Sequence, residues 1–229
     1  MQRQFSIQEI KASYTEEKKA GDGPWTRYVL RPISFFFAKL FFSMGISPNT
    51  VSYSSAVISI IGFFFLAFGS PAAVYLGFFL FFLFGVLDCA DGNMARTLGG
   101  GSPYGEWVDA VSGYVAYAAF FLGIGAAEGS RFWLLSASAA LAGNLLLRLA
   151  FQSYRAAKQA ASEAREETKG ERKFSESIGI TGFLVPLSCF AYIFNFLWLI
   201  IALYTAVYCG GFFIMIIKLI IRLNKDMRS

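Results

Sequence analysis

The sequence predicts an all-α integral membrane protein with six transmembrane helices preceded by an interfacial amphipathic helix. The first observation is composition: the 229 residues are 56% hydrophobic and 18% aromatic, which is too apolar for an ordinary soluble domain. The second is length, because several apolar stretches can cross a hydrocarbon layer about 30 Å thick. The third is charge, since Lys and Arg gather in segments that a six-span chain places on one side of the membrane.

Three parts are expected along the chain. The polar N-terminal part contains an apolar stretch, Ile33–Met44, which is too short to span a membrane. Because Arg31 and Lys39 accompany it, we expect this stretch to form a helix that lies in the membrane interface. The expected parts are a cytoplasmic segment over 1–46, a membrane domain over 47–223 and a cytoplasmic tail over 224–229.

The predicted spans follow the apolar runs. The last two share one block of about 45 residues, which would be roughly 68 Å long as a single helix, so the block must cross twice. We expect the break between these two crossings near Asn195. The spans cover about 49–68, 71–98, 103–127 and 132–159, with the fifth and sixth inside 178–223.

Basic residues predict the orientation. They lie in the N-terminal segment, in the loop after the fourth span and in the tail, whereas Arg131 is the only basic residue of the opposite loops. By the positive-inside rule both ends are cytoplasmic, and we expect the cell (inner) membrane as the location. The net charge is +5, and we expect the excess basic residues to contact anionic lipid headgroups and not nucleic acid. Residues 160–177 either continue the fourth span as a solvated helix or form a loop.

Three aspartates lie where the second and third spans meet: Asp88, Asp91 and Asp109. An ionised carboxylate in hydrocarbon costs several kcal/mol, so such residues persist only with a partner. The chain has no His, and carboxylate oxygens favour hard divalent cations, so we expect Mg²⁺ or Mn²⁺, with Ca²⁺ also compatible. The alternative is that the acids pair with arginines at a helix end, although Arg96 alone cannot neutralise three of them.

Helical spacing places small residues on the same faces as these acids. A helix turns about 100° per residue, so residues three, four or seven apart share a face. Two such faces could aim three carboxylates into one site, and the small residues would leave it open. The second span presents Asp88, Asp91, Gly92 and Ala95, and the third presents Gly105, Asp109 and Gly113.

The spacing Asp88-x2-Asp91-Gly92-x2-Ala95-Arg96-x8-Gly105-x3-Asp109 resembles the signature of the CDP-alcohol phosphotransferase family. The stretch Gly45-Ile-Ser-Pro-Asn-Thr-Val51-Ser is similar to the one that opens the first span in many members, and the resemblance covers about residues 45–223. It implies a six-span transferase of EC 2.7.8 type. Such an enzyme moves a phosphate-linked group from a CDP-alcohol, such as CDP-diacylglycerol, to an alcohol acceptor and releases CMP.

The resemblance also implies roles for the motif residues. The metal or metals would be held by Asp88, Asp91 and Asp109. The nucleotide and its diphosphate would lie against Asp88, Asp91, Gly92, Ala95, Arg96 and Gly105. Members of the family are often homodimers, so a homodimer is possible here.

The chain departs from the family pattern at one position, because the family's fourth Asp is replaced by Gly113. In the family that residue is a metal ligand and the general base for the acceptor hydroxyl. One explanation is that Glu106, Tyr114 or Tyr117 substitutes, and we name Asp109 and Glu106 as the candidate catalytic residues. A second is that the acceptor is already anionic and needs no deprotonation, with a nucleotide-sugar as one possible donor. A third is that the chain has lost activity.

A basic stripe on the fourth span adds a candidate acceptor site. Asn144, Arg148 and Arg155 share a helical face, and this face could bind a second anion such as an acceptor phosphate. The alternatives are that Arg148 pairs with one of the aspartates or extends to the cytoplasmic surface.

The sequence therefore favours a metal-dependent membrane transferase of phospholipid or glycolipid synthesis. Its expected partners are a CDP-linked or other nucleotide-linked donor, a lipid, polyol or phosphate acceptor, and membrane lipids. The alternative is an inactive family member that serves as a nucleotide-binding or interaction module. An ion channel or transporter is disfavoured, because its acids would be spread through the membrane depth and here they cluster at one end.

Overall fold

The computed structural model describes residues 4–160 and 179–226, and the side chains within these ranges except 154–160, 219 and 222–226. The described residues form helices joined by short turns, without a strand. This confirms the all-α membrane fold class expected from the sequence. The long helices are α4 (Pro48–Phe68), α5 (Pro71–Thr97), α6 (Pro103–Ala127), α7 (Arg131–Ala160) and α10 (Leu197–Asp226).

The first four of these helices begin and end within one residue of the predicted spans. Three of them start with Pro directly after a Ser. The first backbone N–H of a helix has no partner within the helix, and Pro suits this position because it has no N–H. The Ser47 hydroxyl accepts a hydrogen bond from the Thr50 amide, and the Ser102 hydroxyl accepts one from the Gly105 amide. These caps satisfy amides of the first turns of α4 and α6.

The block predicted to hold two spans is broken at Asn195, as expected. Asn195 has a positive φ of 57°, a left-handed conformation that Asn tolerates better than most residues. The helices on either side are a π-helical turn η2 (Ile180–Leu184) with α9 (Val185–Ile193), and α10. Within the described ranges five helices are long and apolar enough to cross a membrane, and Ile180–Ile193 is shorter. The count of six spans therefore stays a prediction.

The N-terminal segment folds into short helices: α1 (Ile7–Ala12), α2 (Glu16–Gly21), η1 (Thr26–Leu30) and α3 (Arg31–Ser43). α3 corresponds to the predicted interfacial helix, and it packs along α5. Its outward face exposes Phe36, Leu40 and Met44, which are four residues apart and form an apolar stripe. A helix with such a stripe is suited to the membrane interface.

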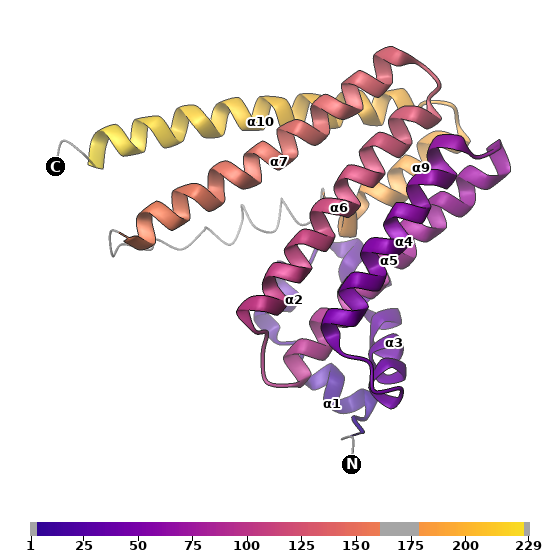
Figure 1. The fold of residues 1–229 in the computed structure, drawn as a ribbon, viewed down its shortest axis with the longest axis vertical. Coiled ribbons are helices and arrows are strands. Elements are labelled where there is room, and N and C mark those ends of the chain that lie inside the picture. The colour runs from indigo at the N-terminus through magenta and orange to yellow at the C-terminus, as the bar shows by residue number, and fades with distance from the viewer. Residues whose placement is uncertain (1–3, 161–178, 227–229) are drawn as a thin grey trace.

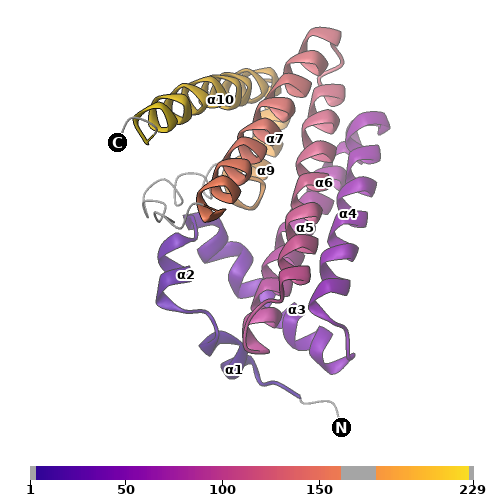
Figure 2. The ribbon, with the colours of Figure 1, turned by 60° about the vertical axis from the view of Figure 1, so that its left-hand side comes forward.

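The long helices form two groups (Figures 1 and 2). In the first group α4 packs along both α5 and α6, whereas α5 and α6 make few direct contacts with each other. In the second group α7 and α10 lie side by side and lean away from the first. The N-terminal helices gather at the end of the first group where α5 ends and α6 begins.

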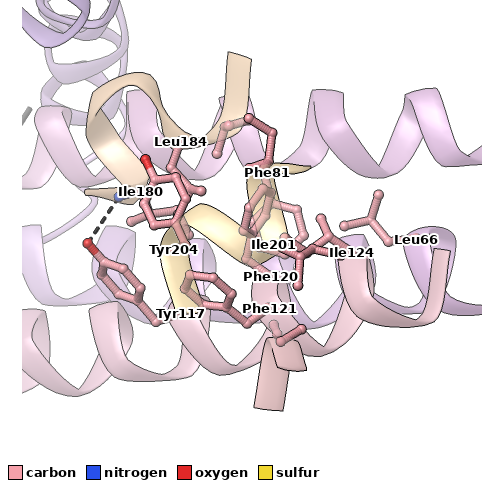
Figure 3. Packing of buried hydrophobic residues seen from close by; sticks show 14 of the residues in the cluster. Leu66, Phe81, Tyr117, Phe120, Phe121, Ile124, Ile180, Leu184, Ile201 and Tyr204 are labelled. Carbon is pink, nitrogen blue, oxygen red and sulfur yellow. Dashed lines mark hydrogen bonds between the residues drawn. The ribbon is translucent and has the colours of Figure 1, made fainter. Parts of the chain in front are cut away.

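The main core is formed by residues of α4, α5, α6, α7, η2, α9 and α10 (Figure 3). Phe81 and Phe120 meet edge to face with ring centroids 4.8 Å apart. A Cβ at Gly77 or Gly123 would come within 3 Å of the Leu66 side chain, so these glycines allow α5 and α6 to approach α4 closely. This packing fixes the frame on which the acidic residues are carried. The labelled core side chains are Leu66, Phe81, Tyr117, Phe120, Phe121, Ile124, Ile180, Leu184, Ile201 and Tyr204.

Candidate functional site

The three aspartates lie on the two helices that flank α4. Asp91 is buried, with 5% of its surface exposed, and its Oδ2 accepts a hydrogen bond of 2.5 Å from the Ser52 hydroxyl of α4. Asp88 is half-buried and Asp109 is exposed. Asp88 interacts electrostatically with Asp109, and Asp91 interacts with both. The helices therefore bring the three negative charges into one electrostatic group.

None of the three aspartates forms an ion pair with a Lys or Arg in the described part of the chain. Pairing with arginines at a helix end, the alternative considered above, thus finds no support among these residues. Neither do three Asp, Glu, His or Cys side chains of the described ranges converge closely enough to enclose a metal ion. The donor chemistry of three neighbouring carboxylates still fits a hard divalent cation, so metal binding stays a prediction.

Ser52 connects the helices of the site, and sequence reasoning did not single it out. Its hydroxyl donates to Asp91 of α5, and its carbonyl oxygen accepts a 3.0 Å hydrogen bond from the Ser112 hydroxyl of α6. The available signal was a polar stripe on an apolar helix, because Ser52, Ser55 and Ser59 recur at helical spacing and all three are buried.

The small residues around the acids are explained by close contacts. A Cβ at Gly92 would lie 3.3 Å from Arg96 Nη1, so the Arg96 guanidinium folds back over Gly92 along α5. A Cβ at Gly105 would lie 3.2 Å from Asn49 Oδ1. Gly113 differs, because nothing lies within 4 Å of its Cβ position. A side chain would fit there, four residues beyond Asp109 on the same face of α6.

Arg96 lies close to the acidic group without pairing with it. Its Nη2 donates a 2.7 Å hydrogen bond to Asn93 Oδ1, while its Nε is buried and has no hydrogen-bond partner among the described atoms. The Arg96 charge nevertheless interacts electrostatically with Asp91 and Asp109. Ala95 is half-buried beside it. Arg96 thus makes a single hydrogen bond among the described residues, and its charge lies near the carboxylates.

A buried ion pair that no sequence pattern indicates anchors the N-terminal segment next to this site. Arg31 Nε donates to Asp22 Oδ2 at 2.6 Å, Lys18 Nζ lies 3.0 Å from Asp22 Oδ1, and the Tyr14 hydroxyl donates to Asp22 at 2.8 Å. Burial alone would raise the pKa of Asp22, but the hydrogen bond and charge of Arg31, followed by Lys18, hold it below its ordinary value. Burial raises the pKa of Tyr14, and its hydrogen bond to Asp22 adds to the effect, so it remains a donor.

The basic stripe on α7 lies against aromatic residues of α6. Arg148 Nε donates to Asn144 Oδ1 at 3.1 Å, and its guanidinium lies 4.6 Å from the Tyr117 ring centroid and 5.9 Å from that of Tyr114. In the described part of the chain Arg148 has no carboxylate partner, so the alternative that it pairs with an aspartate finds no support among these residues. The Arg155 side chain lies outside the described residues, and so do residues 161–177, for which the sequence allows either a solvated helix or a loop.

Glu106, the predicted substitute for the family's fourth acid, lies on the exposed first turns of α6. It faces the turn that precedes the helix, where a Cβ at Gly101 would lie 3.6 Å from its Cγ. Seven residues of helix, about 10 Å, separate it from Gly113. The structure therefore brings Asp88, Asp91, Asp109 and Arg96 together and places Glu106 at their edge.

Comparison with known proteins agrees with the fold. The family model described as CDP-alcohol phosphatidyltransferase matches residues 45–223. The fold is similar to the Mycobacterium tuberculosis phosphatidylinositol phosphate synthase (PgsA1) in apo form, with a TM-score of 0.54, 20% identity, and coverage of 79% of this chain and 94% of that one. The same enzyme with CDP-DAG bound gives a TM-score of 0.52, 19% identity, and coverage of 82% and 92%.

A comparison of the sequence with curated proteins finds no match. The family match covers well over half of the chain and confirms the resemblance carried by the aspartate motif. The chain therefore belongs to the CDP-alcohol phosphatidyltransferase family, membrane enzymes that transfer a phosphatidyl group from a CDP-alcohol to an alcohol acceptor in phospholipid synthesis.

Proposed function

We propose that this protein transfers a phosphatidyl group from a CDP-linked lipid such as CDP-diacylglycerol to an alcohol acceptor that carries an anionic group. The observation that carries the proposal is the group of three carboxylates on α5 and α6 that have no ion pair in the described part of the chain. The relative solved with CDP-DAG bound supports a CDP-linked donor.

A divalent cation, Mg²⁺ or Mn²⁺, would be held by Asp88, Asp91 and Asp109. When bound it would neutralise charge on the diphosphate of the donor and on the CMP leaving group. The buried Asp91 is oriented by Ser52, whose hydroxyl donates to its Oδ2. Arg96 would bind a phosphate oxygen through its guanidinium, which makes one hydrogen bond among the described residues, from Nη2 to Asn93.

In the reaction the acceptor hydroxyl oxygen bonds to the phosphorus of the phosphatidyl group. The bond from that phosphorus to the oxygen of CMP breaks, and CMP leaves. The hydroxyl proton needs an acceptor, and Gly113 supplies none. Tyr117 and Tyr114 are engaged, because their hydroxyl oxygens accept hydrogen bonds from the Ile180 amide and from Gln152. Asp109 is the remaining carboxylate on this face of α6, and we assign the proton to it.

Arg148 supports an acceptor with its own negative charge. Its guanidinium lies against Tyr117, one helical turn beyond Gly113, and no carboxylate of the described residues neutralises it. A phosphate on the acceptor would pair with this cation, and the acceptor hydroxyl would then lie toward Asp109. Arg155 would extend the same face toward the membrane surface. By the distribution of Lys and Arg, this site faces the cytoplasm.

The test is CMP release by the purified full-length protein in detergent, with CDP-diacylglycerol and either Mg²⁺ or Mn²⁺. Acceptors are compared in pairs, inositol phosphate with inositol and glycerol phosphate with glycerol. We expect release that needs the cation and that is at least tenfold faster with the phosphorylated member of a pair. Arg148→Gln should raise KM for that acceptor and leave KM for CDP-diacylglycerol unchanged.

Two results would contradict the proposal. Equal rates of CMP release with phosphorylated and neutral acceptors would contradict the proposed binding of an acceptor phosphate by Arg148. Tight nucleotide binding without CMP release from any acceptor would instead favour a nucleotide-binding module. A homodimer, which the family resemblance also predicts, is tested separately by cross-linking in native membranes.

A further inference from the structure

The Asn93 side chain joins two arginines at the end of α5. Its Oδ1 accepts a 2.9 Å hydrogen bond from Arg31 Nη1 and a 2.7 Å hydrogen bond from Arg96 Nη2. Its Nδ2 donates to the Ser34 hydroxyl at 2.9 Å. Asn93 is fully buried, so these partners replace water and fix the orientation of the amide.

The N-terminal segment holds this amide in place. Arg31 is 5% exposed and is anchored on one side by Asp22, while its Nη1 also donates to the Cys89 carbonyl oxygen of α5 at 3.1 Å. Ser34, the partner of the Asn93 amide nitrogen, lies on the same helix as Arg31. The position of Asn93 thus depends on groups that lie about 60 residues earlier in the sequence.

Asn93 in turn restrains a cation of the candidate site. The Arg96 guanidinium lies over Gly92, and the described residues offer it one hydrogen bond, to Asn93. A long side chain at a helix end is otherwise free to adopt several rotamers. The hydrogen bond to Asn93 thus holds the Nη2 side of the guanidinium, and the Arg96 charge interacts electrostatically with Asp91.

We propose that Asn93 is a positioning residue: through its shared hydrogen bonds the N-terminal segment sets the Arg96 guanidinium for the diphosphate of the donor. This inference rests on the proposed function, since Arg96 must bind the donor for its position to affect catalysis. It assigns residues 5–43 a part in donor binding.

The experiment is a double-mutant cycle on CDP binding, measured by calorimetry with full-length protein in detergent and Mg²⁺. The variants are Asn93→Ala, Arg96→Ala and the double substitution. We expect Asn93→Ala to weaken CDP binding about tenfold, the value of one hydrogen bond to a charged group. In the Arg96→Ala background the same change should have an effect below about twofold, because Asn93 acts only through Arg96.

A matched control removes a different contact of the N-terminal segment. The Thr97 hydroxyl of α5, one residue after Arg96, donates to the Ser13 hydroxyl at 3.1 Å. Ser13→Ala should therefore leave CDP affinity within about twofold of wild type. Asn93→Asp keeps the acceptor oxygen for both arginines, so its CDP affinity should be closer to wild type than that of Asn93→Ala.

The outcomes separate the two proposals. Independent, multiplicative effects in the cycle, or an equal loss in Ser13→Ala, would overturn the positioning role and leave the proposed function intact. A wild-type protein that binds no CDP would overturn the proposed function and this inference with it. If Asn93→Ala does not fold, the cycle is run with Asn93→Ser, and the same non-additivity is required.

Discussion

Two groups of charged side chains lie close together at the end of α5, and they are built in opposite ways. In the first, Asp22 and Arg31 have side chains only 1% and 6% exposed and form an ion pair of 2.6 Å. In the second, Asp88, Asp91 and Asp109 repel one another and have no ion pair in the described part of the chain. Charges of the first kind hold a structure together, whereas unpaired acids are kept at a cost to stability and therefore indicate a function.

The largest expected effect tests the second group. Asp109→Asn should reduce CMP release by at least 10²-fold, because it removes both a carboxylate ligand and the proposed proton acceptor. Its thermal stability should be unchanged or higher, since one of three mutually repelling charges is lost. Glu106→Gln is the control, and its rate should stay within about twofold of wild type. A larger loss of CMP release in Glu106→Gln than in Asp109→Asn would contradict the assignment of Asp109 as the proton acceptor.

The next effect tests the first group. Asp22→Asn leaves Arg31 buried without its anion, which costs about 3–5 kcal/mol in comparable cases. The N-terminal segment should detach, and hydrogen exchange over residues 5–30 should become fast while α4–α6 stay protected. The exposed pair of Lys19 with Glu16 provides the control, because Glu16→Gln should leave exchange unchanged. Unchanged protection in Asp22→Asn would show that the ion pair does not hold the segment.

These two groups also differ in how far the sequence predicted them. The acidic group was predictable because its residues lie on neighbouring spans and at helical spacing, and the spans were predictable from the apolar runs. Arg31 and Asn93 are 62 residues apart, and nothing local indicates that they meet. Ser52 was missed for the same reason, since its partner Asp91 is 39 residues away.

The break at Asn195 was expected, whereas the sixth crossing remains a prediction. Ile180–Ile193 is apolar but shorter than a span, and hydropathy alone does not show how such a segment sits in a membrane. The contact of Arg148 with Tyr117 was also not predictable, because it depends on how α7 packs against α6.

A smaller effect is expected from pH. The pKa of Asp22 is lowered in the folded protein, so its contribution to stability is complete well above its unfolded pKa of about 3.9. That contribution is lost as pH falls below this value toward the folded pKa. Trp25 packs against Phe82 and Phe183, so its fluorescence in a variant with the other three Trp replaced by Phe reports docking. The signal should change below about pH 4 in the parent. If the Trp25 fluorescence of Asp22→Asn changed over the same pH range, the assignment of this transition to protonation of Asp22 would be contradicted.

The smallest effect on stability is expected from Gly113→Asp. Nothing lies within 4 Å of the Cβ position, so the side chain is accommodated, and the loss of a helical Gly offsets part of the added repulsion. The melting temperature should move by only a few degrees, downward without Mg²⁺ and upward with it. A gain of ordinary transfer to neutral alcohols would show that position 113 alone limits acceptor choice. No gain, with activity on phosphorylated acceptors retained, would agree with the proposed function.

The most direct test of the central claim is a calorimetric titration of Mg²⁺ or Mn²⁺ into the full-length protein with saturating CDP. The three carboxylates should take up the cation, and Asp88→Asn with Asp91→Asn should abolish the uptake while Asp22→Asn retains it. Absence of uptake by the wild-type protein, or equal uptake by the Asp88→Asn/Asp91→Asn variant, would contradict the claim that these unpaired acids form a cation site.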